Sequence, residues 1–121
     1  MNFGDYKLLV FFFRTERRNE PVRKWIKSLS KDDKRTIGED IKTIQFGWPL
    51  GMPLVEKISP NLWEVRTKIK NGIARIIFTI DVKKIILLHG FIKKTKKIPK
   101  RDLEIAKSRL KLYQEGKNER K

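Results

Sequence analysis

The stretch "LWEVRTKIKNGIARIIFTID", residues 62–81, decides the fold, because two strand-like segments flank an Asn-Gly pair. Asn-Gly is a strong signal for a two-residue hairpin turn, since both residues tolerate a positive φ. With Asn71 and Gly72 as the turn, Lys70 faces Ile73, and side chains alternate between the two faces from there. One face is then almost wholly apolar and needs helices to cover it: Trp63, Val65, Thr67, Ile69, Ala74, Ile76, Phe78 and Ile80.

The opposite face of the predicted hairpin concentrates positive charge. Its residues are Glu64, Arg66, Lys68, Arg75, Ile77 and Thr79. In this register Arg75 lies directly across from Lys68 and diagonally from Arg66, although facing like charges destabilise a sheet. An arginine fork can hold two phosphate oxygens at once. The pattern indicates an anion-binding face, with ordinary exposed positions of a lysine-rich sheet as the alternative.

The segments around the hairpin predict one α+β domain. They are a strand over 6–14, a helix over 19–29, a helix from Ser30 to the 47–53 loop, strands over 54–58, 62–69, 73–81 and 84–92, and a helix opened by Pro99. Asn19 is the expected cap of the first helix, and Ser30 with Asp33 resembles a capping box. We expect one domain over 1–113 and a polar tail over 114–121.

The second hairpin decides which way the single histidine points. If residues 82–83 form its turn, Gly90 lies across from Arg75, while His89 and Phe91 point toward the apolar face. A shift of one residue would reverse these faces. We expect a packed His89, with a chemical role as the open alternative. Four lysines follow, either at the rim of the cationic face or in a solvated loop: Lys93, Lys94, Lys96 and Lys97.

The overall charge of the chain indicates an anionic partner. Its 121 residues include 30 Lys and Arg against 14 Asp and Glu, a formal net charge of +16 at pH 7. A surface of this charge attracts polyanions at long range. Nucleic acid is the first candidate, an anionic membrane the second and an acidic protein the third.

Composition also excludes several classes of site. Cysteine is absent and one histidine is present, which excludes disulfides and argues against a metal centre. No apolar run is long enough for a membrane span or a signal peptide. We therefore expect a cytoplasmic protein without a cofactor.

A face of arginines and lysines can cleave RNA without a metal. The 2′-hydroxyl of RNA is an internal nucleophile, so the protein has to orient it, stabilise the phosphorane charge and move protons. Arginines suit the second task, and a histidine or a lysine of lowered pKa suits the third. Such a site is weak by itself, which suggests that another molecule presents the substrate.

Four segments carry a specific resemblance: "EDIKTIQFGWPLGMPLVEKI", "LWEVRTK", "ARIIF" and "LLHGFIKKTKKIPKRDLEIAKSR". Over roughly residues 20–110 the chain resembles the phage-derived branch of the RelE/HigB toxins of type II toxin–antitoxin systems. The resemblance implies a RelE-like, microbial-ribonuclease-type fold: an antiparallel sheet, two N-terminal helices on one face and a C-terminal helix. It also implies a ribosome-dependent endoribonuclease that cleaves translated mRNA and is neutralised by a helix-turn-helix antitoxin of the HigA type.

The resemblance further implies the site residues. Its basic strand positions fall on Arg66, Arg75, Lys93 and Lys94, and the general base is left open among His89, Lys93 and Lys94. The expected RNA contacts are Lys57, Lys68, Phe91, Lys96 and Lys97. Several relatives have a late tyrosine that acts on the substrate, but Tyr113 is better explained by the apolar stripe of the last helix. Phe91 could stack on a base in its place but cannot exchange a proton.

Other functions stay open beside the nuclease. A non-catalytic RNA- or ribosome-binding module could block translation by occupancy, and a purely structural basic protein would depend on no particular arginine. Trp48, in the loop over 47–53, is expected to be a core anchor, with an antitoxin contact as the alternative.

Overall fold

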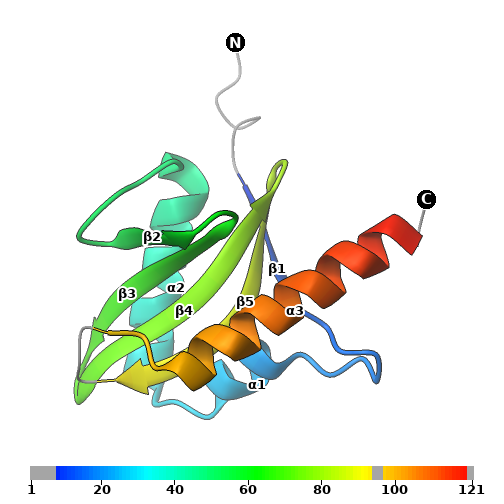
Figure 1. Ribbon diagram of the computed structural model, residues 1–121. Helices are drawn as coiled ribbons and strands as arrows, with labels where there is room; N and C mark the ends of the chain where they lie inside the picture. The colour runs from blue at the N-terminus through cyan, green and yellow to red at the C-terminus, as the bar shows by residue number, and fades with distance from the viewer. Residues whose placement is uncertain (1–7, 94–96, 120–121) are drawn as a thin grey trace.

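The computed structural model describes residues 8–93 and 97–119 (Figure 1). Within these ranges the elements are β1 Leu9–Phe12, α1 Pro21–Lys27, α2 Lys31–Gly47, β2 Val55–Ser59, β3 Leu62–Ile69, β4 Gly72–Asp81, β5 Lys84–Lys93 and α3 Lys100–Glu119. The predicted order of one strand, two helices, a meander and a final helix is confirmed. α3 includes residues 114–119, which were expected as part of a tail. None of the helices in the described ranges is both long and apolar enough to cross a membrane.

The five strands of this α+β fold form one mixed sheet in the order β1-β5-β4-β3-β2. Strands β2 to β5 are antiparallel neighbours, as the hairpin signals predict. β1 runs parallel to β5, with Leu9 beside Lys84, so the expectation of an antiparallel sheet is wrong at this edge. The alternation of apolar and polar residues shows where a strand lies in the sequence, but it does not show which other strand pairs with it. Parallel partners also need a long connection, here everything between β1 and β5.

The turn between β3 and β4 lies one residue earlier than predicted, at residues 70–71. Gly72, with a φ of 148°, already pairs with the end of β3. Arg66 therefore lies directly across from Arg75, and the predicted Arg75–Lys68 pair is wrong. Moving the turn by one residue shifts the β4 partner of each β3 residue by two positions. Side chains alternate between the faces with a period of two, so both predicted faces of the hairpin are retained.

A bulge in β5 changes the register of the second hairpin. Phe78 pairs with Leu87, as the predicted turn requires, but Ile77 pairs with His89. Leu88 is thus an extra residue on β5. Beyond a one-residue bulge, every side chain lies on the opposite face from the one that simple alternation gives.

The bulge reverses the surroundings of three predicted residues. Phe91 pairs with Arg75, so His89 and Phe91 lie on the face of the arginines. Gly90 points to the other side, where an added Cβ would lie 2.5 Å from Cε3 of Trp25. The predictions that Gly90 faces Arg75 and that His89 points toward the core of α1 and α2 are therefore wrong. The glycine makes room for the indole of α1 and not for a nucleic acid base.

Helices cover both faces of the sheet (Figure 1). The inward residues are Val22, Ile37, Ile41 and Ile44 of α1 and α2 on one side, and Ala106, Leu110 and Tyr113 of α3 on the other. The apolar face predicted for the hairpin is the one that α1 and α2 cover. Trp48 also packs there, edge-on to Trp63 with 5.2 Å between ring centroids, so the prediction of a core anchor is confirmed.

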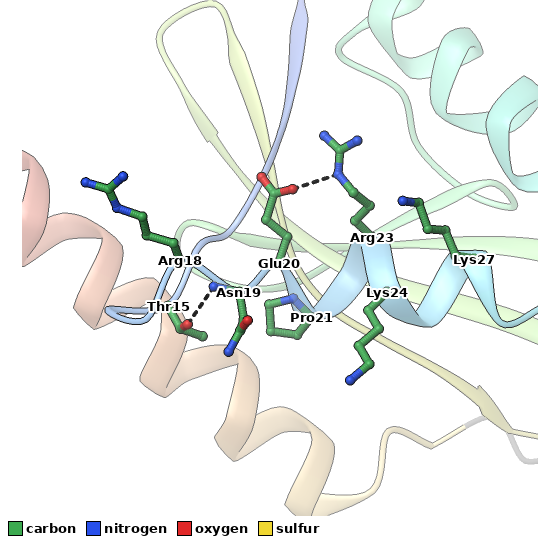
Figure 2. A pocket seen from close by; sticks show the side chains of 8 residues that line it. All are labelled: Thr15, Arg18, Asn19, Glu20, Pro21, Arg23, Lys24 and Lys27. Atoms are coloured by element: carbon green, nitrogen blue, oxygen red, sulfur yellow. Dashed lines mark hydrogen bonds and ion pairs between the residues drawn. The ribbon is translucent and has the colours of Figure 1, made fainter.

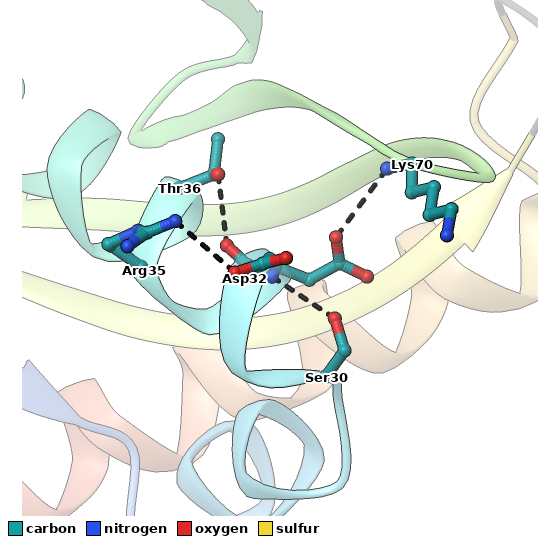
Figure 3. Close-up of polar contacts among 6 residues, drawn as sticks. Ser30, Asp32, Arg35, Thr36 and Lys70 are labelled. Atoms are coloured by element: carbon teal, nitrogen blue, oxygen red, sulfur yellow. Dashed lines mark hydrogen bonds and ion pairs between the residues drawn. The ribbon is translucent and has the colours of Figure 1, made fainter.

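The start of α2 is tied to the central hairpin (Figure 3). Ser30 caps α2 by accepting a hydrogen bond from the N–H of Asp33 at 3.2 Å, as predicted. The carboxylate of Asp33 accepts a second one, from the N–H of Lys70 in the β3–β4 turn at 3.5 Å. α1 begins differently: Glu20 and not Asn19 is its N-cap residue, without a side-chain capping bond.

Candidate functional site

The face covered by α3 holds two arginines and two glutamates. Arg66 and Arg75 oppose each other on β3 and β4, and Glu56 and Glu64 oppose each other on β2 and β3. Arg66 donates from Nε to Glu64 Oε1 at 2.8 Å and from Nη2 to Glu56 Oε1 at 2.6 Å. Arg75 Nη1 lies 3.7 Å from Glu64 Oε2. We name these four residues the Glu–Arg quartet, and their formal charges cancel.

The quartet is accessible to solvent from the β2 side. The side chains of Arg75 and Glu64 are 2% and 1% exposed, whereas those of Arg66 and Glu56 are 22% and 43% exposed. Arg66 is therefore the arginine that a solute can reach, and Arg75 acts from the interior. The centre of the predicted cationic face is neutral, because each arginine has a carboxylate beside it.

α3 adds two polar residues that the sequence reasoning missed. Asp102 Oδ1 lies 2.7 Å from His89 Nε2, and Arg109 Nη1 lies 3.4 Å from His89 Nδ1. Arg109 Nη1 also donates to the carbonyl oxygen of Leu88 at 2.8 Å. Asp102 and Arg109 are two helical turns apart, on the same side of α3 as the buried Ala106. The inward stripe of this helix was thus the signal that could have found them.

These contacts engage both ring nitrogens of His89. A guanidinium only donates hydrogen bonds, so Arg109 faces a lone pair on Nδ1, and we assign the ring proton to Nε2, which donates to Asp102. Burial lowers the pKa of Arg109, yet a guanidinium keeps its charge in proteins. Within the described ranges, no set of three or more His, Asp and Glu side chains could hold a metal ion.

Lysines form an exposed rim at one end of this face. Lys68 on β3 and Lys93 on β5 lie on either side of Ile73 in the register, and both lysines are exposed. Beyond β5 lies a shallow hollow of about 510 Å³, lined by Lys93, Lys97, Ile98, Pro99, Lys100 and Leu103. The predicted residues Lys94 and Lys96 lie outside the described residues. Positive charge therefore adjoins the neutral quartet.

Two predicted RNA contacts lie away from this rim. The Lys57 Nζ lies 5.7 Å from the ring centroid of Trp63, on the face of α2 and opposite to the quartet. Phe91 is 9% exposed and stacks on His89 with 5.6 Å between ring centroids. Its ring is therefore enclosed, and stacking on a base is not supported by this arrangement.

A second basic hollow, of about 550 Å³, lies where the chain leads into α1 (Figure 2). Its lining residues are Thr15, Arg18, Asn19, Glu20, Pro21, Arg23, Lys24 and Lys27. Glu20 pairs with Arg23 at 2.7 Å, and Lys24 points away from Arg23 in the view of Figure 2. Its cations do not converge on one point, which is typical of a solvated surface.

A sequence comparison gives the family of the chain. Residues 24–111 match the family described as phage derived protein Gp49-like (DUF891). The chain belongs to this family. The match extends from α1 into α3, so it includes the quartet, His89 and both of its partners on α3. Gp49-like proteins are phage-derived and are associated with the toxins of toxin–antitoxin systems. No curated protein matches this Gp49-like chain.

Proposed function

We propose that this Gp49-like protein is the toxin of a type II pair of the RelE/HigB kind, with a RelE-like fold, and that it cleaves translated mRNA on the ribosome. The observation that carries the proposal is the placement of Arg66, which is held at two nitrogens, partly exposed and adjacent to the lysine rim. Membership of a toxin-associated family and a net charge of +16 support it. RNA is the substrate that such a surface attracts.

The proposed reaction uses the 2′-hydroxyl of RNA as the nucleophile. This oxygen attacks the adjacent phosphorus, the bond to the 5′-oxygen breaks, and a 2′,3′-cyclic phosphate and a 5′-hydroxyl end result. Arg66 stabilises the charge that develops on the phosphorane, while Arg75 contributes from the interior. Lys93, as an exposed ammonium, donates a proton to the leaving 5′-oxygen. His89 accepts the proton of the 2′-hydroxyl at Nδ1 once Arg109 releases that nitrogen, while Nε2 keeps its proton on Asp102.

The proposed reaction implies two macromolecular partners. The ribosome presents the mRNA, because a site with so few acid–base groups needs its substrate held in place. Lys68 and Lys97 contact phosphates of mRNA or rRNA there and release counterions. In the cytoplasm an acidic antitoxin of the helix-turn-helix HigA type neutralises the toxin by charge complementarity.

Induced expression in bacteria with mapping of mRNA 5′ ends tests this function. Wild type should stop growth and produce new ends inside translated frames. Arg35→Ala, which removes an exposed arginine of α2 paired with Asp32, is the matched control and should behave in the same way. Arg66→Ala should stay folded and produce far fewer new ends. Equal cutting by Arg66→Ala would contradict the proposed site.

A non-catalytic ribosome-binding module is the second candidate. It is favoured by the neutral quartet and by the burial of Arg75, which leave the accessible positive charge on the lysines. Such a module would stop growth by occupancy and leave mRNA intact. In the same experiment, arrested growth without new 5′ ends would select this function over the nuclease.

A further inference from the structure

Two like-charged pairs lie side by side in the quartet. Glu56 faces Glu64, and Arg66 faces Arg75. Either pair alone would destabilise its strands by repulsion. Together they interlock, because Arg66 reaches back to both glutamates and Glu64 also approaches Arg75. Glu64 is thus the carboxylate that contacts both arginines.

The complete burial of Glu64 is unfavourable by itself. An ionised carboxylate loses its hydration on burial, and charged partners are needed to compensate. Apolar side chains often replace buried ion pairs without loss of stability, so packing alone does not require a glutamate here. An apolar residue could not, however, accept the hydrogen bond from Arg66 Nε at 2.8 Å. That bond restricts a long and otherwise flexible side chain.

We propose that Glu64 is a positioning residue that orients Arg66 toward the scissile phosphate, an inference that rests on the proposed function. Glu64 holds Nε of Arg66, and Glu56 holds Nη2. Nη1 of Arg66 has no partner among residues 8–93 and 97–119, and Nη2 uses one of its two N–H groups on Glu56. Nη1 therefore has both of its N–H groups left to donate to a phosphate oxygen. Arg75 balances the carboxylate of Glu64 from β4, so that the carboxylate does not cancel the charge of Arg66 alone.

Arginine side-chain NMR tests the positioning without any measurement of activity. In the wild type, the Nε–H of Arg66 should exchange slowly with water, because its proton is bonded to a buried carboxylate. Glu64→Met keeps the side-chain length but removes the acceptor, and it should speed this exchange about tenfold or more. Glu39→Met, at an exposed position of α2, is the matched control and should not change it. Arg66→Lys identifies the signal by its loss.

Single-turnover cleavage of mRNA on programmed ribosomes connects the positioning with the reaction. Glu64→Met should lower the rate constant about 100-fold, the order of loss expected when a catalytic group is misplaced by about 1 Å. The ribosome concentration that gives half the maximal rate should stay unchanged. A residue that acts through Arg66 has no further effect once Arg66 is removed. Glu64→Met/Arg66→Ala should therefore cleave at the rate of Arg66→Ala.

The outcomes separate this inference from the proposed function. If the wild type does not cleave mRNA, the proposed function is wrong. The Nε–H exchange of Arg66 still tests whether Glu64 orients that side chain. If Glu64→Met does not fold, Glu64→Met/Arg75→Met removes both charges of the buried pair. This double variant replaces Glu64→Met in the exchange measurement, which does not depend on the catalytic contribution of Arg75, and that measurement then decides the inference. Unchanged Nε–H exchange, full-rate cleavage by the folded variant, or a further loss of rate on top of Arg66→Ala would overturn the inference.

Discussion

Gly90→Ala is expected to destabilise the protein by about 1–3 kcal/mol, the range for an overfilled site in a packed core. The added Cβ would lie 2.5 Å from Cε3 and 2.6 Å from Cζ3 of Trp25. Favourable carbon–carbon contacts are about 3.5–4.0 Å long, so the indole has to move by about 1 Å. The indole is rigid and packs between α1 and β5, so the helix has to move with it.

Thermal unfolding followed by circular dichroism measures this effect. For a domain of this size, a change of 1 kcal/mol shifts Tm by about 4 °C, so Gly90→Ala should lower Tm by about 4–12 °C. Gly38→Ala is the matched control in α2, where nothing lies within 4 Å of the added Cβ, and it should maintain or raise Tm. Trp25→Leu should reduce the penalty of Gly90→Ala in the double variant. A Tm of Gly90→Ala at or above that of the wild type would refute the bulged register.

Three further predictions concern single contacts. Ser30→Ala should lower the free energy of unfolding by about 1 kcal/mol, because the N–H of Asp33 loses its cap, and urea denaturation measures this loss. Asp102→Asn weakens the bond to His89, so amides at the start of α3 should exchange faster with solvent, and equal protection would contradict a role in anchoring α3. Lys93→Gln should reduce the slope of log affinity against log salt by about 0.7 for single-stranded RNA. Fluorescence anisotropy at several salt concentrations measures that slope, and an unchanged value would exclude a phosphate contact.

Local patterns were sufficient to predict the elements and the faces of the central hairpin. β3 was expected over 62–69 and is observed there, and Ser30 caps α2, because alternation and capping act within a few residues. The turn at residues 70–71 moved the register by two residues without changing either face. A strand repeats every second residue, so the error did not affect which side chains share a face.

Contacts between distant segments account for what the sequence did not predict. The bulge at Leu88 buries that side chain against α3 and turns Gly90 toward α1. α1 is far from β5 in sequence, and the residues of α3 that pack on Leu88 lie beyond the end of the strand. Asp102 becomes a recognisable partner only after the bulge has turned His89 toward α3. A pattern within one strand contains none of this information.

The parallel pairing of β1 with β5 has a consequence during synthesis. β1 is made early, but its partner Lys84 follows Leu9 by about 75 residues, a high sequence separation for neighbouring strands. At about 5–20 residues per second, the first strand waits roughly 4–15 s for its neighbour. α3, which contributes both side-chain partners of His89, is made later still. The site is therefore incomplete throughout synthesis, and under the proposed function the protein becomes able to act on a ribosome only after its own chain is finished.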